Sequence, residues 1–338
     1  MSINIIFFGT PAIALKSLEY LYNSDKVNVL AVVTQPDKPA GRGHKLTMSP
    51  IKQFALEKGL PVFQPKSIRK EPEIQAELKK LKPDFFVTFA FGQILSQEVL
   101  DIPKYETINL HASLLPKYRG ANPIQRAIIN GDKETGICTM ITELGLDCGD
   151  VCMREKIQIP ENMTCVDLFE EISDKSPELI EKTLTGLVSG SIKPVKQCED
   201  GLCMANKLTK EETLIDWSKP AREIHNLVRG IYKFPSAYFI HNDKIIKVLE
   251  TRVVEGSGKC GKFVSFSKDG ATSINNCGQI IDVCKDGVTG TNNCGQIMGV
   301  YKEGIKIGCG KDCILLVKVK PEGKGEMFAR DWANGIRG

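Results

Sequence analysis

Short apolar runs separated by turn residues mark the first half of the chain. Residues 3–8 form a mostly apolar run that ends at Gly9-Thr10-Pro11, and a helical pattern of apolar positions follows it. A run of this kind is typical of a buried parallel strand that leads into a crossover helix. The same reasoning predicts further strands at 27–33, 61–63, 84–91, 107–110, 136–142 and 151–159, and helices at 50–58, 121–129 and 164–187.

The alternation of strands and helices predicts an α/β fold with a doubly wound, Rossmann-like parallel sheet. Such sheets bind ligands beyond the carboxyl ends of their strands, near the point where the strand order reverses. Gly9, Gly92 and the segment 109–111 all follow predicted strands. We therefore expect them to surround one site.

Shorter strands and Gly-rich turns characterise the second half. Residues 220–231 have the pattern of an amphipathic helix, and 238–254 alternate in strand fashion around a turn at 241–244. Short strands continue to Val319, which predicts a small β-barrel. The segment 275–280, NNCGQI, recurs seventeen positions later and is interpreted as a local tandem duplication.

The length of 338 residues suits two domains better than one core, with 42% hydrophobic and 25% charged residues as in ordinary soluble proteins. Gly190, Pro194 and Gly201 mark residues 190–207 as a linker between domains at 1–189 and 208–338.

Positive charge is concentrated in the second domain. From Asn206 onward there are 21 Lys and Arg against 15 Asp and Glu, whereas the preceding residues have 24 against 26. This balance suits a polyanionic partner, although a merely solvated surface explains it equally well.

The twelve cysteines form no metal or disulfide framework that the spacing supports, since no CxxC pair occurs and the four His lie elsewhere. We expect no signal peptide, because the apolar run at 3–8 is too short for a signal core and lacks a basic lead, and no apolar run has the length of a membrane span. We expect a cytoplasmic protein with reduced thiols, no metal and no membrane contact.

The most specific chemistry lies at 107–120. Alternate residues of a strand share a face, so Asn109 and His111 can point into one crevice, and Asp147 follows in a Gly-flanked turn. An amine that attacks a formyl carbon produces an oxyanion, which an amide N–H and an imidazolium stabilise. A carboxylate beside the imidazole can move the amine proton. Together the three residues fit transfer of a one-carbon acyl group to an amine.

Taken singly, each of these residues also has a structural explanation as a strand-end or turn residue. The loop after His111, with its Leu-Leu-Pro and Arg-Gly sequences, has no obvious structural need and favours a function. A nicotinamide-dependent dehydrogenase is disfavoured because the first turn lacks the G-x-G-x-x-G pattern, and no Walker P-loop occurs.

The run 109–120 together with Gly145-Leu146-Asp147 resembles the folate-dependent formyltransferases, whose signature is an Asn, a His two positions later, a Ser-Leu-Leu-Pro loop and a later Asp. Residues 34–43 resemble the inserted loop of the members that act on initiator tRNA. The resemblance extends from Ile3 to about Ile336. It implies 10-formyltetrahydrofolate as donor and the amino group of methionine on initiator tRNA as acceptor, for translation initiation.

The resemblance also implies roles for individual residues. It implies that Asn109, His111 and Asp147 are the catalytic residues. It also implies that the second domain is an OB-like barrel that binds tRNA. The folate-binding loop comprises Ser113, Leu114, Leu115 and Pro116.

The inserted loop supplies candidate tRNA contacts, because Lys and Arg bind phosphates through charge and counterion release. These candidates are Lys38, Arg42 and Lys45, and the alternative is a basic surface loop with no partner. Arg119 either contacts the folate tail or the acceptor phosphate, or clamps its loop through backbone carbonyls, and we favour the clamp.

Two other functions compete with this one. A related formyltransferase could act on a sugar nucleotide or on glycinamide ribonucleotide. The basic loop argues against the sugar nucleotide, and the presence of a second domain argues against glycinamide ribonucleotide. A non-enzymatic RNA-binding protein would not need Asn109, His111 and Asp147 together. We expect the formyl group to be transferred directly, without a covalent enzyme intermediate, because no cysteine adjoins the strand end at Asn109. We also expect the protein to be a monomer.

Overall fold

The computed structural model describes residues 2–40, 45–259 and 297–337. The chain forms two compact units, each assembled from separate stretches of sequence. The first unit comprises Met1–Pro123, Glu134–Ile159 and Asp167–Asn206, and the second comprises Ile124–Lys133, Pro160–Val166 and the chain from Lys207 onward.

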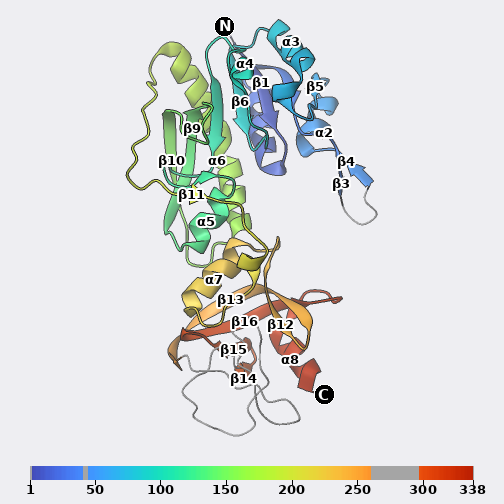
Figure 1. Ribbon diagram of the computed structural model, residues 1–338, viewed down its shortest axis with the longest axis vertical. Coiled ribbons are helices and arrows are strands. Elements are labelled where there is room, and N and C mark those ends of the chain that lie inside the picture. The colour runs from blue at the N-terminus through green and yellow to red at the C-terminus, as the bar shows by residue number, and fades with distance from the viewer. Residues whose placement is uncertain (1, 41–44, 260–296, 338) are drawn as a thin grey trace. The chain divides into compact units, whose positions relative to one another are not determined.

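A seven-stranded sheet forms the centre of the first unit (Figure 1), in the order β10-β9-β7-β6-β1-β2-β5. The five strands from β5 to β7 are parallel, which confirms the predicted α/β parallel sheet, and β9 runs antiparallel to both of its neighbours. The strands are β1 (Ile3–Gly9), β2 (Val27–Val33), β5 (Val62–Phe63), β6 (Phe85–Phe89), β7 (Thr107–His111), β9 (Glu134–Ile141) and β10 (Val151–Gln158).

Helices and short hairpins complete this unit. They are η1 (Ala12–Ala14), α1 (Leu15–Asn23), β3 (Lys38–Ala40), β4 (Lys45–Thr47), α2 (Pro50–Glu57), η2 (Ile68–Lys70), α3 (Pro72–Lys80), α4 (Gln97–Leu100), β8 (Arg119–Gly120), α6 (Cys165–Ser189) and β11 (Met204–Ala205). The start of α2 follows from its sequence, because the Ser49 side chain accepts a hydrogen bond from Lys52 N and a proline occupies the first turn.

Strand β1 is apolar on both faces. Ile6 and Phe8 belong to a buried cluster that also contains Leu78 of α3 and Val99 of α4. Phe7 alternates onto the opposite face and is fully buried too. Because the chain leaves β1 toward β2 and β5 and returns through β6 on its other side, the strand order reverses between β1 and β6. The carboxyl ends of β1, β6 and β7 therefore meet at the edge where ligands bind.

Residues 190–207, which the sequence predicts as a linker, belong to the first unit as far as Asn206. Val195 and Val151 exchange two backbone hydrogen bonds of 2.9 Å, and β11 pairs in parallel with β8. These backbone hydrogen bonds attach the segment to the loops at the carboxyl edge, so it is part of the structure around the site.

In the described part of the second unit, six strands form an antiparallel sheet in the order β12-β13-β16-β15-β14 with β17 beside β16. Trp217, Phe239 and Trp332 pack edge to face at its core. The elements are α5 (Pro123–Ile129), η3 (Glu211–Thr213), α7 (Ala221–Gly230), β12 (Ala237–His241), β13 (Lys244–Lys259), β14 (Ile297–Tyr301), β15 (Gly304–Gly308), β16 (Lys311–Pro321), β17 (Met327–Phe328) and α8 (Ala329–Arg337).

The predicted amphipathic helix and hairpin are present in this unit. Asn242 and Asp243 adopt left-handed φ angles of 47° and 57° in the two-residue turn that joins β12 to β13, as tight hairpins require. Helix α8 was not predicted. The duplicated segment lies outside the described residues except for Ile297, and the closed OB-like barrel remains a prediction. In the described ranges no helix is long and apolar enough to cross a membrane.

Candidate functional site

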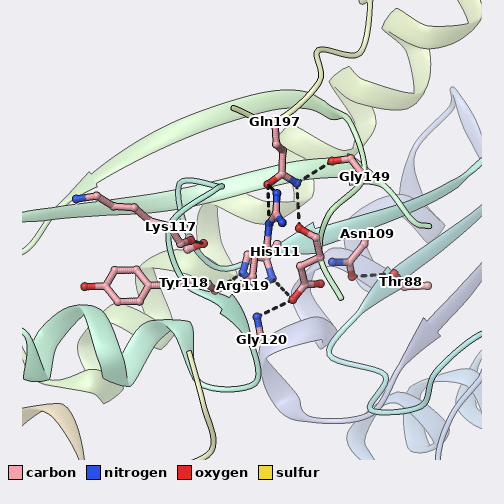
Figure 2. Close-up of polar contacts among 11 residues, drawn as sticks. Thr88, Asn109, His111, Lys117, Tyr118, Arg119, Gly120, Gly149 and Gln197 are labelled. Carbon is pink, nitrogen blue, oxygen red and sulfur yellow. Dashed lines mark hydrogen bonds and ion pairs between the residues drawn. The ribbon is translucent and has the colours of Figure 1, made fainter. Parts of the chain in front are cut away.

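Strand β7 places Asn109 beside β6, at the edge where the parallel strands end. Asn109 is in register with Thr88, whose hydroxyl donates a hydrogen bond of 2.8 Å to Asn109 Oδ1. Figure 2 shows the amide nitrogen of Asn109 on the side away from Thr88, toward the hydrogen bonds around His111. The amide is therefore oriented so that its N–H groups can donate to a ligand.

His111 is buried and contacts an acceptor at each ring nitrogen. Its Nε2 lies 2.8 Å from the carbonyl oxygen of Tyr118, and its Nδ1 lies 3.5 Å from Asp147 Oδ2. A carbonyl only accepts, so Nε2 carries a hydrogen and donates it. The Nδ1 edge of the ring is therefore the one that faces the Asp147 carboxylate.

Asp147 joins two loops that are distant in sequence. Its Oδ2 accepts a hydrogen bond of 2.8 Å from Gly120 N, and its backbone has a left-handed φ of 49°. The structure therefore brings the carboxylate to His111, as the sequence predicted, and Asn109 lies two residues earlier on the same strand.

Buried side chains of the loop that follows His111 fix its conformation. Ser113 is fully buried and its hydroxyl donates 2.5 Å to the Lys117 carbonyl, while Leu115 packs with Met140 and Val151. The side chains of Ser113 and Leu115 thus shape the loop, whereas Leu114 and Pro116 remain partly exposed.

Arg119 binds Gln197, a residue that no sequence motif marks. Its Nε and Nη2 donate hydrogen bonds of 3.0 and 2.7 Å to Oε1 of Gln197. These two bonds go to a side chain, whereas the sequence favoured a clamp through backbone carbonyls. Gln197 stands in a segment with the composition of a linker, and no local pattern distinguishes it from the polar residues around it.

Comparison with known proteins identifies the family. The formyl transferase model matches residues 1–184, and the model of the formyl transferase C-terminal domain matches residues 207–337. Proteins named methionyl-tRNA formyltransferase from Clostridium perfringens (strain 13 / Type A) and Clostridium novyi (strain NT) are 41% and 40% identical to it, over 98% of this chain and 96% of each relative. This chain belongs to the methionyl-tRNA formyltransferase family.

A solved structure supports the fold of this methionyl-tRNA formyltransferase family member. The N-formyltransferase from Helicobacter canadensis, crystallised with folinic acid and dTDP-3-aminofucose, superposes with a TM-score of 0.61 at 20% identity, covering 94% of this chain and 99% of that chain. At this level of identity the likeness concerns the fold alone.

The inserted loop of this family member has a fixed base. Asp37 accepts hydrogen bonds of 2.7 Å from Lys52 Nζ and 2.8 Å from Gln64 Nε2. The Lys52 ammonium holds the pKa of the Asp37 carboxyl below its ordinary value. Lys38 is exposed on β3 and Lys45 begins β4, whereas Arg42 lies outside the described residues.

Two thiols of the first unit, those of Cys138 and Cys152, are poor nucleophiles because of burial. Burial raises the pKa of Cys138 to about 11 and that of Cys152 to about 12, so both remain protonated near neutral pH. Cys203 Sγ instead accepts a hydrogen bond of 3.3 Å from Tyr118 N. Within the described part of the chain, no cluster of three or more His, Cys, Asp or Glu could hold a metal ion.

Proposed function

We propose that this protein transfers the formyl group of 10-formyltetrahydrofolate to the amino group of methionyl initiator tRNA, and that Asn109, His111 and Asp147 perform the reaction. The observation that carries the proposal is the approach of Asp147 Oδ2 to His111 Nδ1 at the carboxyl end of β7, next to Asn109. Membership of the methionyl-tRNA formyltransferase family supplies the substrates.

Each of the three side chains has a distinct task. The amine nitrogen forms a bond to the formyl carbon, and the carbonyl oxygen takes on negative charge. Asn109 Nδ2 donates to this oxygen, and His111 donates from its Nδ1 edge when that nitrogen carries a proton, because Nε2 is engaged by Tyr118. Asp147 accepts a proton from the attacking nitrogen, directly or through one water, and gives it to the folate nitrogen as the bond from that nitrogen to the formyl carbon breaks. No covalent enzyme intermediate is needed.

The two units divide the work in this proposal. The first unit carries the chemistry and the folate-binding loop at 113–116. The second is an OB-like domain that binds tRNA, supported by its antiparallel sheet and by the six surplus positive charges from Asn206 onward. We further propose that the enzyme is a monomer and that it acts in the cytoplasm, where its tRNA substrate is used.

An assay with several acceptors tests the proposed function. We expect labelled formyl to pass from 10-formyltetrahydrofolate to methionyl initiator tRNA, and to pass poorly to an amino sugar nucleotide or to glycinamide ribonucleotide. Preference for either small amine would replace the proposed acceptor. Binding of tRNA without turnover would favour the RNA-binding alternative.

Removal of the positive charges of the inserted loop tests its part in tRNA binding. In the Lys38→Ala, Arg42→Ala, Lys45→Ala triple variant, kcat/KM for tRNA should fall by roughly tenfold or more, because contacts with the tRNA phosphates are lost. The slope of log affinity against log salt concentration should also become shallower by about one unit for each lost contact. Turnover at saturating tRNA should stay unchanged.

A matched variant controls for net charge. Lys58, Lys79 and Lys80 are exposed on α2 and α3 or just beyond them. Replacement of all three by Ala removes the same charge from the same unit. Equal losses in the two triple variants would show that the inserted loop has no special role.

A further inference from the structure

Gln197 uses the full hydrogen-bonding capacity of its side chain at the candidate site. Its Nε2 donates 2.9 Å to the carbonyl of Asp147 and 2.7 Å to the carbonyl of Gly149, and its Oε1 accepts twice from Arg119 (Figure 2). It is 8% exposed. The opposite amide orientation would place its oxygen against two carbonyl oxygens, so the contacts fix the orientation.

These bonds close a ring of interactions around the carboxylate of Asp147. Gln197 holds the backbone of Asp147, Gly120 N holds its carboxylate, and Arg119 connects Gly120 back to Gln197. Asp147 needs such support because its φ of 49° lies in the left-handed region, which residues other than glycine rarely adopt. Without Gln197, the turn loses the side chain that braces this conformation.

The backbone on both sides of Gln197 is attached to the same loops. Val195 pairs with Val151, next to the Asp147 turn, through two bonds of 2.9 Å. Farther along, Arg119 N donates 3.0 Å to Cys203 O, and Ala121 N donates 2.9 Å to Ala205 O. Residues 195–205 therefore join the loop that carries Asp147 to the loop that carries Gly120.

We propose that Gln197 is a positioning residue for formyl transfer, which sets the place of the Asp147 carboxylate relative to His111. The inference rests on the proposed function, because it gives Asp147 a task in the reaction. Gln197 acts through Asp147 and does not itself contact the reacting atoms. Its loss should therefore lower kcat and leave the affinities for folate and tRNA nearly unchanged.

Two substitutions at Gln197 test this role in the full-length protein. Gln197→Ala removes all four bonds, whereas Gln197→Glu keeps the partner of Arg119 but turns an oxygen toward the carbonyls of Asp147 and Gly149. Each should lower kcat by roughly 10- to 100-fold, since small misplacements of a catalytic group have effects of this size. Each KM should stay within about threefold of the wild-type value, as expected when ground-state binding is kept.

Gln75→Ala is the matched control. Gln75 is half-buried and, like Gln197, donates to a backbone carbonyl, that of Ile68 at 2.7 Å, but it lies on α3. Its replacement should leave kcat unchanged. If Gln197→Ala fails to fold, Gln197→Glu decides the question, because it retains the buried contact with Arg119.

A double variant separates positioning from a general structural role. In an Asp147→Asn background, Gln197→Ala should reduce kcat by less than about threefold further, because residues that act through one another are not additive. A full additional loss there would overturn the inference. So would a normal kcat for Gln197→Ala in an active enzyme, whereas a wild-type protein without formyl transfer would refute the proposed function itself.

Discussion

Asp147→Asn is expected to lower kcat by about 10³-fold, within the range for loss of a general acid or base. Asparagine keeps the shape of aspartate and an oxygen that accepts from Gly120 N, so the turn and its hydrogen bond are preserved. It lacks the negative charge that lies 3.5 Å from His111 Nδ1 and cannot take up the proton of the attacking amine. The chemical step should therefore slow while the protein remains folded.

Single-turnover formyl transfer at saturating tRNA measures this effect. Asp150→Asn serves as the control, because Asp150 stands three residues later in the same turn and is similarly half-buried. That variant should stay within about threefold of wild type, as surface-type substitutions outside the mechanism usually do. A near-normal rate for Asp147→Asn would remove this carboxylate from the mechanism.

His111→Ala should lower kcat by roughly two orders of magnitude or more, which is the effect of removing one donor to an oxyanion. The variant loses the imidazole whose Nδ1 lies 3.5 Å from Asp147 Oδ2, although the carboxylate keeps its hydrogen bond from Gly120 N. It also leaves the Tyr118 carbonyl without its donor at 2.8 Å. Loss of one intramolecular hydrogen bond costs about 0.5–1.5 kcal/mol, so the free energy of unfolding should fall as well.

His225→Ala separates these two consequences. His225 is buried in the second unit, where its ring nitrogens lie 2.9 Å from Thr251 Oγ1 and 3.2 Å from the Glu161 carbonyl. Its removal should destabilise the protein by a comparable amount without lowering kcat. Equal rate losses in the two variants would mean that His111 matters for folding and not for chemistry.

The sequence predicts the parts of the fold that depend on local patterns. Apolar runs identified β1, β2 and β7, and strand alternation placed Asn109 and His111 on one strand end. Strand direction has no such local signal, since an edge strand such as β10 is half-polar in either orientation. The antiparallel pairing of β9 with β7 therefore appears only in three dimensions.

Contacts between distant residues explain what sequence reasoning missed at the site. Gln197 binds Arg119 and Asp147, which precede it by 78 and 50 positions, so no spacing rule connects them. For the same reason, the loop motif did not indicate that Ser113 and Leu115 point inward. Burial depends on what packs against a loop, and here β9 and β10 supply the partners of Leu115.

The two units interleave along the chain, because the second one includes Ile124–Lys133 and Pro160–Val166. No single cut can separate them into two intact pieces. A nascent chain would likewise have to extend through Asn206 before the first unit, and with it the candidate site, has all of its parts. Exchange of one whole unit between relatives would require all three of its stretches to be replaced.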